Sequence, residues 1–250
     1  MADTEFKLDF VIVGAQKAGT SAVDNYLRQH PEIATGKIKE LHFFDNEDLF
    51  KAGNVDYKDL HNQINYQPGY LVSGECTPIY MYWNPSMKRI REYNPLIKII
   101  VILRNPLTRA YSHWNMNRNR YGEISFLDSV KKESERVKEA LPLQHREYSY
   151  VDRGFYSVQL ERIYSLFKKE QVLVLKYEEF NVDPQAVLSK IFDFIGVNKK
   201  IFSFKNESVN YFEYKNKMEE EAREYLHEIY ADDIKKVEKM LNWNCDDWRV

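Results

Sequence analysis

The segment GAQKAGTS at residues 14–21 combines the residue types that bind a phosphate or sulfate group. The apolar run 10–13 before it predicts a buried strand, and a helix is expected to open at Thr20 and Ser21. Such a junction presents backbone N–H groups and the positive end of a helix dipole to an anion. Lys17 adds a full positive charge, and the hydroxyl groups add donors. Taken alone, the segment also fits an ordinary turn with a surface lysine.

The position of the lysine separates this segment from the nucleoside-triphosphate loop G-x-x-x-x-G-K-[ST]. Lys17 comes before the second glycine, Gly19, not after it. An NTPase also needs an acidic magnesium ligand after a strand, whereas Arg104 and Asn105 follow the most apolar predicted strand. A kinase or NTPase is therefore disfavoured, and a non-catalytic nucleotide-binding protein is the second rival.

The segment KELHFFD at residues 39–45 places two carboxylates and an imidazole, Glu40, His42 and Asp45, among apolar residues. One interpretation is a general base in a partly apolar pocket, because burial raises the pKa of a carboxyl group towards neutrality. The other is a half-buried strand whose apolar side chains face inward. The segment by itself does not separate the two.

A second anion site is expected where the apolar run 97–103 ends. Arg104 stands at that end, and Pro106 suits the first turn of a helix. Ser112 then lies about two helical turns further on. An arginine and a serine so placed could hold a phosphate through charge-assisted hydrogen bonds. The alternative is an arginine that pairs with a nearby acid.

Two aromatic-rich stretches lie close to these motifs along the chain. Core packing is the commoner fate of such residues, and an acceptor pocket is the functional interpretation. The residues are Tyr80, Tyr82, Trp83, His113, Trp114 and Tyr121. Of these, Tyr80, Trp83 and Trp114 are taken as candidate acceptor-binding residues. Glu75 is expected either to bind a polar acceptor or to form a structural ion pair.

The elements that must position these residues alternate between strands and helices. Strands are predicted at 10–13, 70–73, 97–103 and 172–176, and helices at 21–29, 125–139, 156–167, 184–195 and 219–241. The alternation predicts an α/β sheet with parallel strands. In such sheets ligands bind beyond the carboxyl ends of the strands, where residues 14–21 would lie.

Composition narrows the class of protein further. The chain has 250 residues, 44% of them hydrophobic, and a formal net charge of −2, which gives no indication of a nucleic-acid or membrane partner. Its two cysteines, Cys76 and Cys245, make neither a disulfide framework nor a metal-ligand set. The polar first residues and the few cysteines favour a cytoplasmic location.

Taken together and in order, the motifs resemble those of the sulfotransferases that use 3'-phosphoadenosine-5'-phosphosulfate (PAPS). The similarity is greatest to the branch of the heparan-sulfate sulfotransferase domains and their bacterial relatives. The segments that carry it are GAQKAGTS at 14–21, His30-Pro31, KELHFFD at 39–45, GECTPIY at 74–80, LRNPLTRAYSHW at 103–114, RGFYSVQL at 153–160, LVLKYEEF at 173–180, Asn206-x-Ser208 and Trp248.

The resemblance implies a P-loop NTPase-like α/β fold of three layers, with a mainly parallel central sheet flanked by helices, in one domain over residues 1–250. It implies PAPS as the sulfuryl donor and 3'-phosphoadenosine-5'-phosphate (PAP) as the product. The implied donor-binding residues are Gly14, Gln16, Lys17, Ala18, Gly19, Thr20, Ser21, Arg104, Ser112 and Tyr156. Backbone N–H groups of residues 18–21 would hold the non-bridging oxygens.

For catalysis, the resemblance assigns the proposed base to Glu40, with His42 and Asp45 beside it. Lys17 would neutralise the leaving phosphate, so Lys17, Glu40 and His42 are the implied catalytic residues. A sulfuryl group carries less negative charge than a phosphoryl group, and turnover without a metal is therefore predicted.

The chain departs from the family pattern near its C-terminus. Some members carry a disulfide there, but this region has only Cys245. The segment 206–218 is expected to cover the nucleotide instead, with Lys215 or Lys217 reaching a phosphate. A polysaccharide-binding member also needs a basic groove, which the net charge does not indicate, so a small or secondary metabolite is the predicted acceptor and a glycan the alternative. The oligomeric state stays open.

Overall fold

A parallel five-stranded sheet forms the centre of the molecule. The computed structural model describes residues 6–51, 53–121, 125–202 and 217–249, without the side chains of 119–121. The strands are β1 (Phe10–Gly14), β2 (Ile33–Ala34), β3 (Val72–Cys76), β4 (Lys98–Leu103) and β5 (Val172–Lys176). Their order is β2-β3-β1-β4-β5, and every neighbouring pair is parallel. The predicted α/β class is confirmed.

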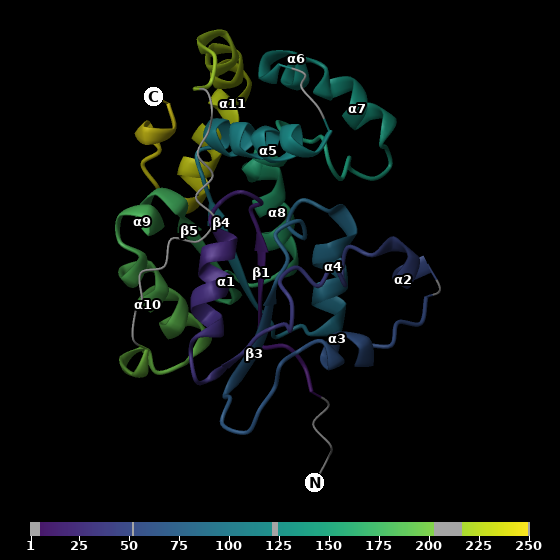
Figure 1. The fold of residues 1–250 in the computed structure, drawn as a ribbon, viewed down its shortest axis with the longest axis vertical. Coiled ribbons are helices and arrows are strands. Elements are labelled where there is room, and N and C mark those ends of the chain that lie inside the picture. The colour runs from purple at the N-terminus through teal and green to yellow at the C-terminus, as the bar shows by residue number, and fades with distance from the viewer. Residues whose placement is uncertain (1–5, 52, 122–124, 203–216, 250) are drawn as a thin grey trace.

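Helices cover both faces of this sheet. They are α1 (Thr20–Arg28), α2 (Glu47–Lys51), α3 (Lys58–Asn62), α4 (Asn84–Tyr93), α5 (Pro106–Tyr121), α6 (Phe126–Lys131), α7 (Glu133–Glu139), α8 (Tyr156–Leu166), α9 (Tyr177–Val182), α10 (Pro184–Ile195) and α11 (Glu220–Leu241). Short 3-10 turns are η1 (Asp152–Gly154), η2 (Lys169–Gln171), η3 (Lys199–Ile201) and η4 (Asp246–Trp248). Figure 1 shows α1, α9 and α10 on one side of the sheet and α4 and α8 on the other, which gives three layers.

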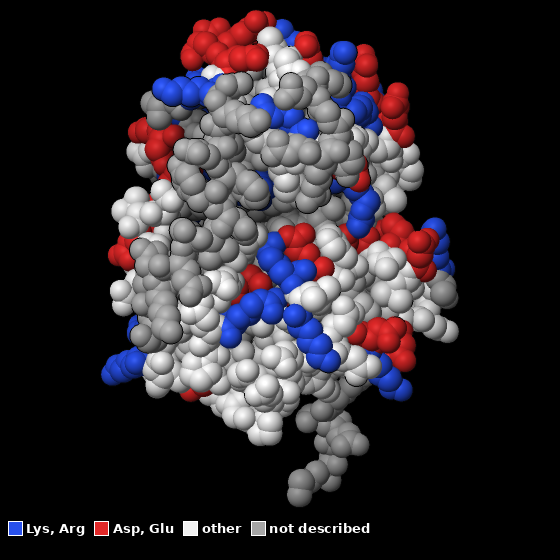
Figure 2. All heavy atoms as spheres, viewed as in Figure 1, with Lys and Arg blue, Asp and Glu red and all other residues white. Residues whose placement is uncertain are grey.

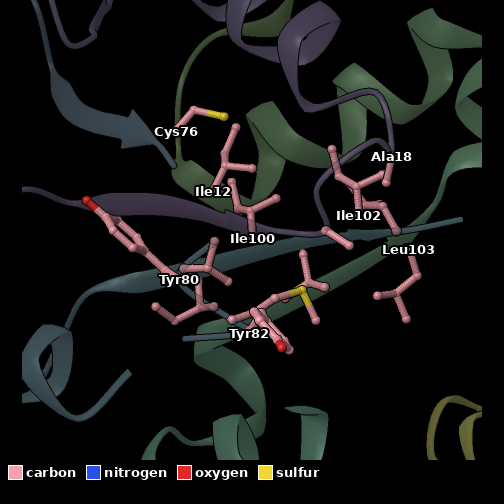
Figure 3. Packing of buried hydrophobic residues seen from close by; sticks show 14 of the residues in the cluster. Ile12, Ala18, Cys76, Tyr80, Tyr82, Ile100, Ile102 and Leu103 are labelled. Carbon is pink, nitrogen blue, oxygen red and sulfur yellow. The ribbon is translucent and has the colours of Figure 1, made fainter. Parts of the chain in front are cut away.

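The central strands are apolar throughout because helices cover them on both sides. All five residues of β1 are buried, as are the last five of β4. Ile12 pairs with Ile100 across the two strands, and Figure 3 shows both side chains in the packed core with Ile102 and Leu103. The carboxyl ends of these two strands are therefore held in a rigid setting.

Two predicted elements need correction, and one strand was not predicted. The strand expected at 70–73 lies at Val72–Cys76, and the two-residue strand β2 was not foreseen. The helix expected over 125–139 is two helices, α6 and α7, that meet at Lys132. The start of the first is as predicted, because Ser125 Oγ accepts a hydrogen bond from the Asp128 N–H at 3.1 Å.

Because all five strands are parallel, their carboxyl ends meet at one edge of the sheet. The segments that follow β1, β3, β4 and β5 begin at Ala15, Thr77, Arg104 and Tyr177. All four of these segments lie within motifs singled out above. Within the described ranges, no helix has the length and apolar character needed to cross a membrane. The cytoplasmic location stays a prediction.

Candidate active site

The loop between β1 and α1 has the tight backbone expected of an anion cradle. Lys17 and Gly19 have φ angles of 71° and 82°, and Gly19 is the N-cap of α1. A Cβ atom on Gly19 would lie 2.9 Å from the ring of Tyr177. Both the positive φ and this close approach therefore require glycine at position 19. The Ala15 N–H donates to Ile102 O at 2.7 Å and fixes the loop to β4.

Not every predicted donor of this loop points outward. The Ala18 N–H donates to Ala15 O within the loop at 3.1 Å, and the Ala18 side chain is buried. Thr20 is also buried, whereas Ser21 and Gln16 are partly exposed. The Gln16 amide oxygen accepts a hydrogen bond from Arg153 at 2.7 Å. The backbone N–H of residue 18 is therefore engaged inside the loop, contrary to the expectation for it.

Arg104 lies directly against this loop. Its Nη1 donates to Lys17 O at 3.0 Å, its Nε donates to Thr108 Oγ1 at 3.0 Å, and its guanidinium lies 4.8 Å from the centre of the Tyr177 ring. Two of its nitrogens thus bond neutral oxygens, one of them on the donor loop, and no ion pair joins Arg104 to an acid among the described residues, which favours the anion-binding interpretation. Ser112 lies on the following helix, α5, with 5% of its surface exposed.

Tyr156 supports Arg104 from the inside of the protein. Its hydroxyl donates to Arg104 O at 2.7 Å, and its side chain has no exposed surface. The Asp233 carboxylate accepts from the Tyr156 N–H at 2.9 Å and holds the start of α8. Tyr156 therefore positions the strand end in this structure, where its burial leaves no surface for a nucleotide.

The segment 39–45 is a loop docked on the end of β3, not the half-buried strand considered as an alternative. The Glu40 N–H donates to Cys76 O at 3.0 Å. The Phe43 and Phe44 N–H groups donate to the Tyr80 hydroxyl at 3.0 and 3.3 Å. Glu40 itself has a φ of 61°, a strained conformation of the kind that concentrates at functional sites. Hydrogen bonds to Cys76 O and the Tyr80 hydroxyl thus hold the loop in a conformation that differs from a strand.

Glu40, His42 and Asp45 form a connected row. His42 Nδ1 lies 3.0 Å from Asp45 Oδ2, and His42 Nε2 lies 3.6 Å from Glu40 Oε2. The Asp45 side chain is fully buried, whereas those of Glu40 and His42 are 32% and 47% exposed. Lys39 Nζ also forms an ion pair with Glu40. The carboxylate that could meet an acceptor is the exposed one, and the buried one orients the imidazole.

The charges in this row lower the pKa of the candidate base, contrary to the raised value expected from burial. Burial does favour the neutral form of Glu40, but hydrogen bonds and charges from His42 and Lys39 outweigh it and bring the pKa to about 2. Hydrogen bonds from His42 to Asp45 and Glu40 raise the pKa of the imidazole to about 9. At neutral pH the pair is a carboxylate beside an imidazolium.

Glu75 lies beneath this loop and not on its surface. It is 2% exposed, and its Oε2 accepts a hydrogen bond from the Thr77 hydroxyl at 2.7 Å. Burial raises the pKa of Glu75 to about 7. Glu75 is therefore buried and does not lie on the surface where an acceptor was expected to reach it.

The predicted aromatic acceptor residues are packed in the core. Tyr80, Trp83 and Trp114 have 0%, 3% and 8% of their surface exposed. The Trp83 indole donates to Glu47 at 2.7 Å, and the Trp114 ring stacks on Tyr111. Burial of large aromatic rings stabilises a fold strongly, which explains why these three side chains lie in the core. In this structure they are core residues, and their role in binding an acceptor stays a prediction.

Two arginines near the site were missed by sequence reasoning. Arg146 forms an ion pair with the buried Asp45, and its Nη1 donates to Asp45 O at 3.0 Å. Arg153 is 3% exposed and bonds the donor loop through Gln16. Arg153 belongs to the motif RGFYSVQL, which was a usable signal, whereas nothing in the sequence around Arg146 singles it out.

Of the residues expected to cover the nucleotide, only the last ones of segment 206–218 fall within the described ranges. Lys217 is exposed, while Lys215 and the pair Asn206 and Ser208 lie outside the described residues. In the part of the chain that the structure describes, no group of three or more His, Cys, Asp or Glu residues could hold a metal ion. Metal-independent turnover stays a prediction.

Comparison with known proteins agrees with this geometry. The family model "Sulfotransferase domain" matches residues 7–239, so the chain belongs to the sulfotransferase domain family. The crystal structure of a sulfotransferase from Alicyclobacillus acidocaldarius superposes with a TM-score of 0.84 at 29% identity, covering 98% of this chain and 100% of that one. The sulfotransferase domain from the curacin biosynthetic pathway, at 16% identity and a TM-score of 0.52, shares the fold.

Curated relatives include the human heparan sulfate glucosamine 3-O-sulfotransferase 3B1, 29% identical over 195 residues. That match covers 76% of this chain and 46% of the relative, so the chain spans about half the length of the relatives of this group. The membrane-associated sulfotransferase kil1 of Dictyostelium discoideum is 21% identical over 318 aligned positions, covering 94% of this chain and 65% of that protein.

Proposed function

We propose that this protein transfers a sulfuryl group from PAPS to a hydroxyl or amine group of an acceptor and releases PAP. The observation that carries the proposal is the meeting of two loops at one sheet edge. Lys17 and Arg104 lie together at the end of β1 and β4, and Glu40 is bonded to the end of β3. When bound, PAPS supplies the sulfuryl group and a phosphate leaving group.

The donor set fits such a nucleotide. A cradle that only glycine at position 19 permits, a lysine, and an arginine bonded to that lysine's main chain all favour a multiply charged anion. In the proposal, Lys17 neutralises charge on the leaving phosphate, and Arg104 with Ser112 binds the 3'-phosphate. In-line transfer requires little covalent work from the protein, so positioning and charge dominate. No metal is assigned a role in it.

Glu40 takes the proton of the acceptor in this proposal. A carboxylate with a pKa of about 2 is a weak base, because Lys39 and His42 stabilise its charge. An acceptor that displaces the Lys39 ammonium would raise the pKa of Glu40 and strengthen it as a base. Asp45 keeps the imidazole of His42 turned towards Glu40.

Replacing the base tests this role directly. Glu40→Gln is expected to lower kcat by about 10²–10⁴-fold, the usual effect of losing a general base. The PAP dissociation constant should stay within a few-fold of the wild type, because Glu40 lies on a different loop from Lys17. Steady-state kinetics and calorimetry measure the two effects. Full activity of the variant on its acceptor would show that Glu40 is not the base.

We propose a small molecule as the acceptor. A glycan is the second candidate, because several relatives are named for heparan sulfate and Figure 2 shows Lys and Arg atoms gathered near the middle of one face despite the net charge of −2. Labelled PAPS offered with alcohols, amines and oligosaccharides separates the two. Preferred transfer to small alcohols or amines supports the proposal, and preferred transfer to an anionic polysaccharide contradicts it.

A further inference from the structure

Arg153, in η1, joins two loops that belong to different parts of the site. Its Nη1 donates to the Gln16 amide oxygen at 2.7 Å, on the loop that carries Lys17. Its Nε donates to Ser149 Oγ at 2.8 Å, and its Nη2 donates to Arg146 O. One guanidinium thus uses all three nitrogens to connect the donor loop with the segment 146–149.

The segment on the other side leads to the candidate base. Arg146 reaches from this segment to Asp45, with Nη1 on the main-chain oxygen at 3.0 Å and Nη2 on the carboxylate. Asp45 in turn holds His42 Nδ1 at 3.0 Å. A continuous series of hydrogen bonds therefore runs from Gln16 through Arg153 and Arg146 to the loop that carries Glu40.

The charge of Arg153 also fits a place behind an anion site. Its three bonding partners are neutral oxygens, and its guanidinium lies 4.7 Å from the centre of the Tyr82 ring. Burial lowers the pKa of Arg153 to about 10, so the group remains charged at neutral pH. A buried cation bonded to neutral partners is stabilised when an anion binds close by.

We propose that Arg153 is a positioning residue that fixes the donor loop (residues 14–21) relative to the catalytic loop (residues 39–45). The inference rests on the proposed function, because it assumes that the donor loop binds the donor nucleotide. In-line transfer makes such a link valuable: a misplacement of about 1 Å between reacting groups costs about 10²-fold in rate. Arginine suits the task, since its rigid fork bonds three acceptors at once and lysine cannot.

Hydrogen–deuterium exchange of the full chain, with and without PAP, tests the link. In the wild type, PAP is expected to slow exchange in both the donor loop and the catalytic loop. Gln16→Ala removes the acceptor on one side, and Arg153→Lys keeps the charge but loses the fork. In each variant, protection of the donor loop should persist, and that of the catalytic loop should fall by about 2- to 30-fold, as for coupling through packed networks.

Arg162→Lys is the matched control. Arg162 is a partly buried arginine of the neighbouring helix α8 whose Nη1 donates to Tyr82 O at 3.2 Å, and it bonds neither loop in the described structure. The variant Arg162→Lys should show the same PAP-induced slowing of exchange in the donor loop and the catalytic loop as the wild type. A second readout is kinetic: Arg153→Lys should lower kcat while the PAP dissociation constant changes by only a few-fold. Gln16→Ala, which alters the donor loop itself, should lower kcat by more than it weakens PAP binding.

The outcomes separate the link from the proposed function. If the two loops stay protected together in Gln16→Ala and Arg153→Lys, Arg153 does not position them and the inference is overturned. If Arg153→Lys does not fold, Gln16→Ala decides alone, since Gln16 is partly exposed. If the wild type shows no PAP protection in any segment, the donor assignment itself fails, and the inference fails with it.

Discussion

At the scale of single residues, the protonation state of Glu40 is the property that governs the proposed chemistry. Two cations, Lys39 and the His42 imidazolium, share this carboxylate and lower its pKa to about 2 against the opposing effect of burial. His42 remains charged to about pH 9 because Asp45 and Glu40 surround it. Around neutral pH, Glu40 is therefore a carboxylate and His42 an imidazolium.

Replacing Lys39 should show how strongly it lowers the pKa of Glu40. Lys39→Met takes away one cause of the lowered pKa, so the pKa of Glu40 rises from about 2 towards its ordinary value of 4.5. Because the ionised carboxylate is the active form, the acidic limb of the kcat/KM profile should move to higher pH. Lys37→Met, two residues away and exposed, is the control and should leave the profile unchanged. An unmoved limb in Lys39→Met would show that Lys39 does not set the charge of Glu40.

At the scale of elements, the helix end of the β1–α1 loop depends on Gly19. Gly19→Ala must accept a φ of 82° and place a Cβ 2.9 Å from the Tyr177 ring. We expect a loss of unfolding free energy of about 1–3 kcal/mol, the usual cost of a strained position, together with weaker PAP binding. Urea unfolding and calorimetry measure the two effects.

Gly53→Ala separates the effect of the positive φ from that of the contact with the Tyr177 ring. Gly53 has a similar φ of 77°, but a Cβ there would meet none of the described atoms within 4 Å. Its substitution should lower the unfolding free energy only by the cost of placing alanine at a positive φ, and it should leave PAP binding unchanged. Equal losses of stability in the two variants would mean that the Tyr177 ring moves aside without cost.

The elements also show how far local sequence patterns reach. The apolar runs at β1 and β5 were predicted within a residue, because parallel strands between helices are short runs rich in Val, Ile and Leu. β1 is buried throughout, whereas Leu173 and Val174 of β5 are partly buried. The strand β2 has only two residues, too few to form a pattern. The loop at 39–45 was ambiguous, since its shape depends on the Tyr80 hydroxyl and on Cys76 O, which are distant in sequence.

At the scale of the whole molecule, the sheet order brings together loops that the sequence keeps apart. β1 lies between β3 and β4, so the segments after these strands, which start near residues 15, 77 and 104, share one edge. The sequence predicted that residues 14–21 and Arg104 follow the carboxyl ends of strands, which is where they lie, and their role in binding the donor stays a prediction. The partners Arg146 and Arg153 could not be predicted as a pair, because only the packing of η1 beneath the donor loop joins them.

Calorimetric binding of PAP without magnesium, with ATP and AMP as controls, tests the central claim most directly. We expect binding that depends on the 3'-phosphate and that weakens in Arg104→Ala, because Arg104 lies beside Lys17 at the proposed phosphate site. Magnesium-dependent binding of ATP, with no preference for a 3'-phosphate, would contradict the account and favour a kinase or NTPase instead.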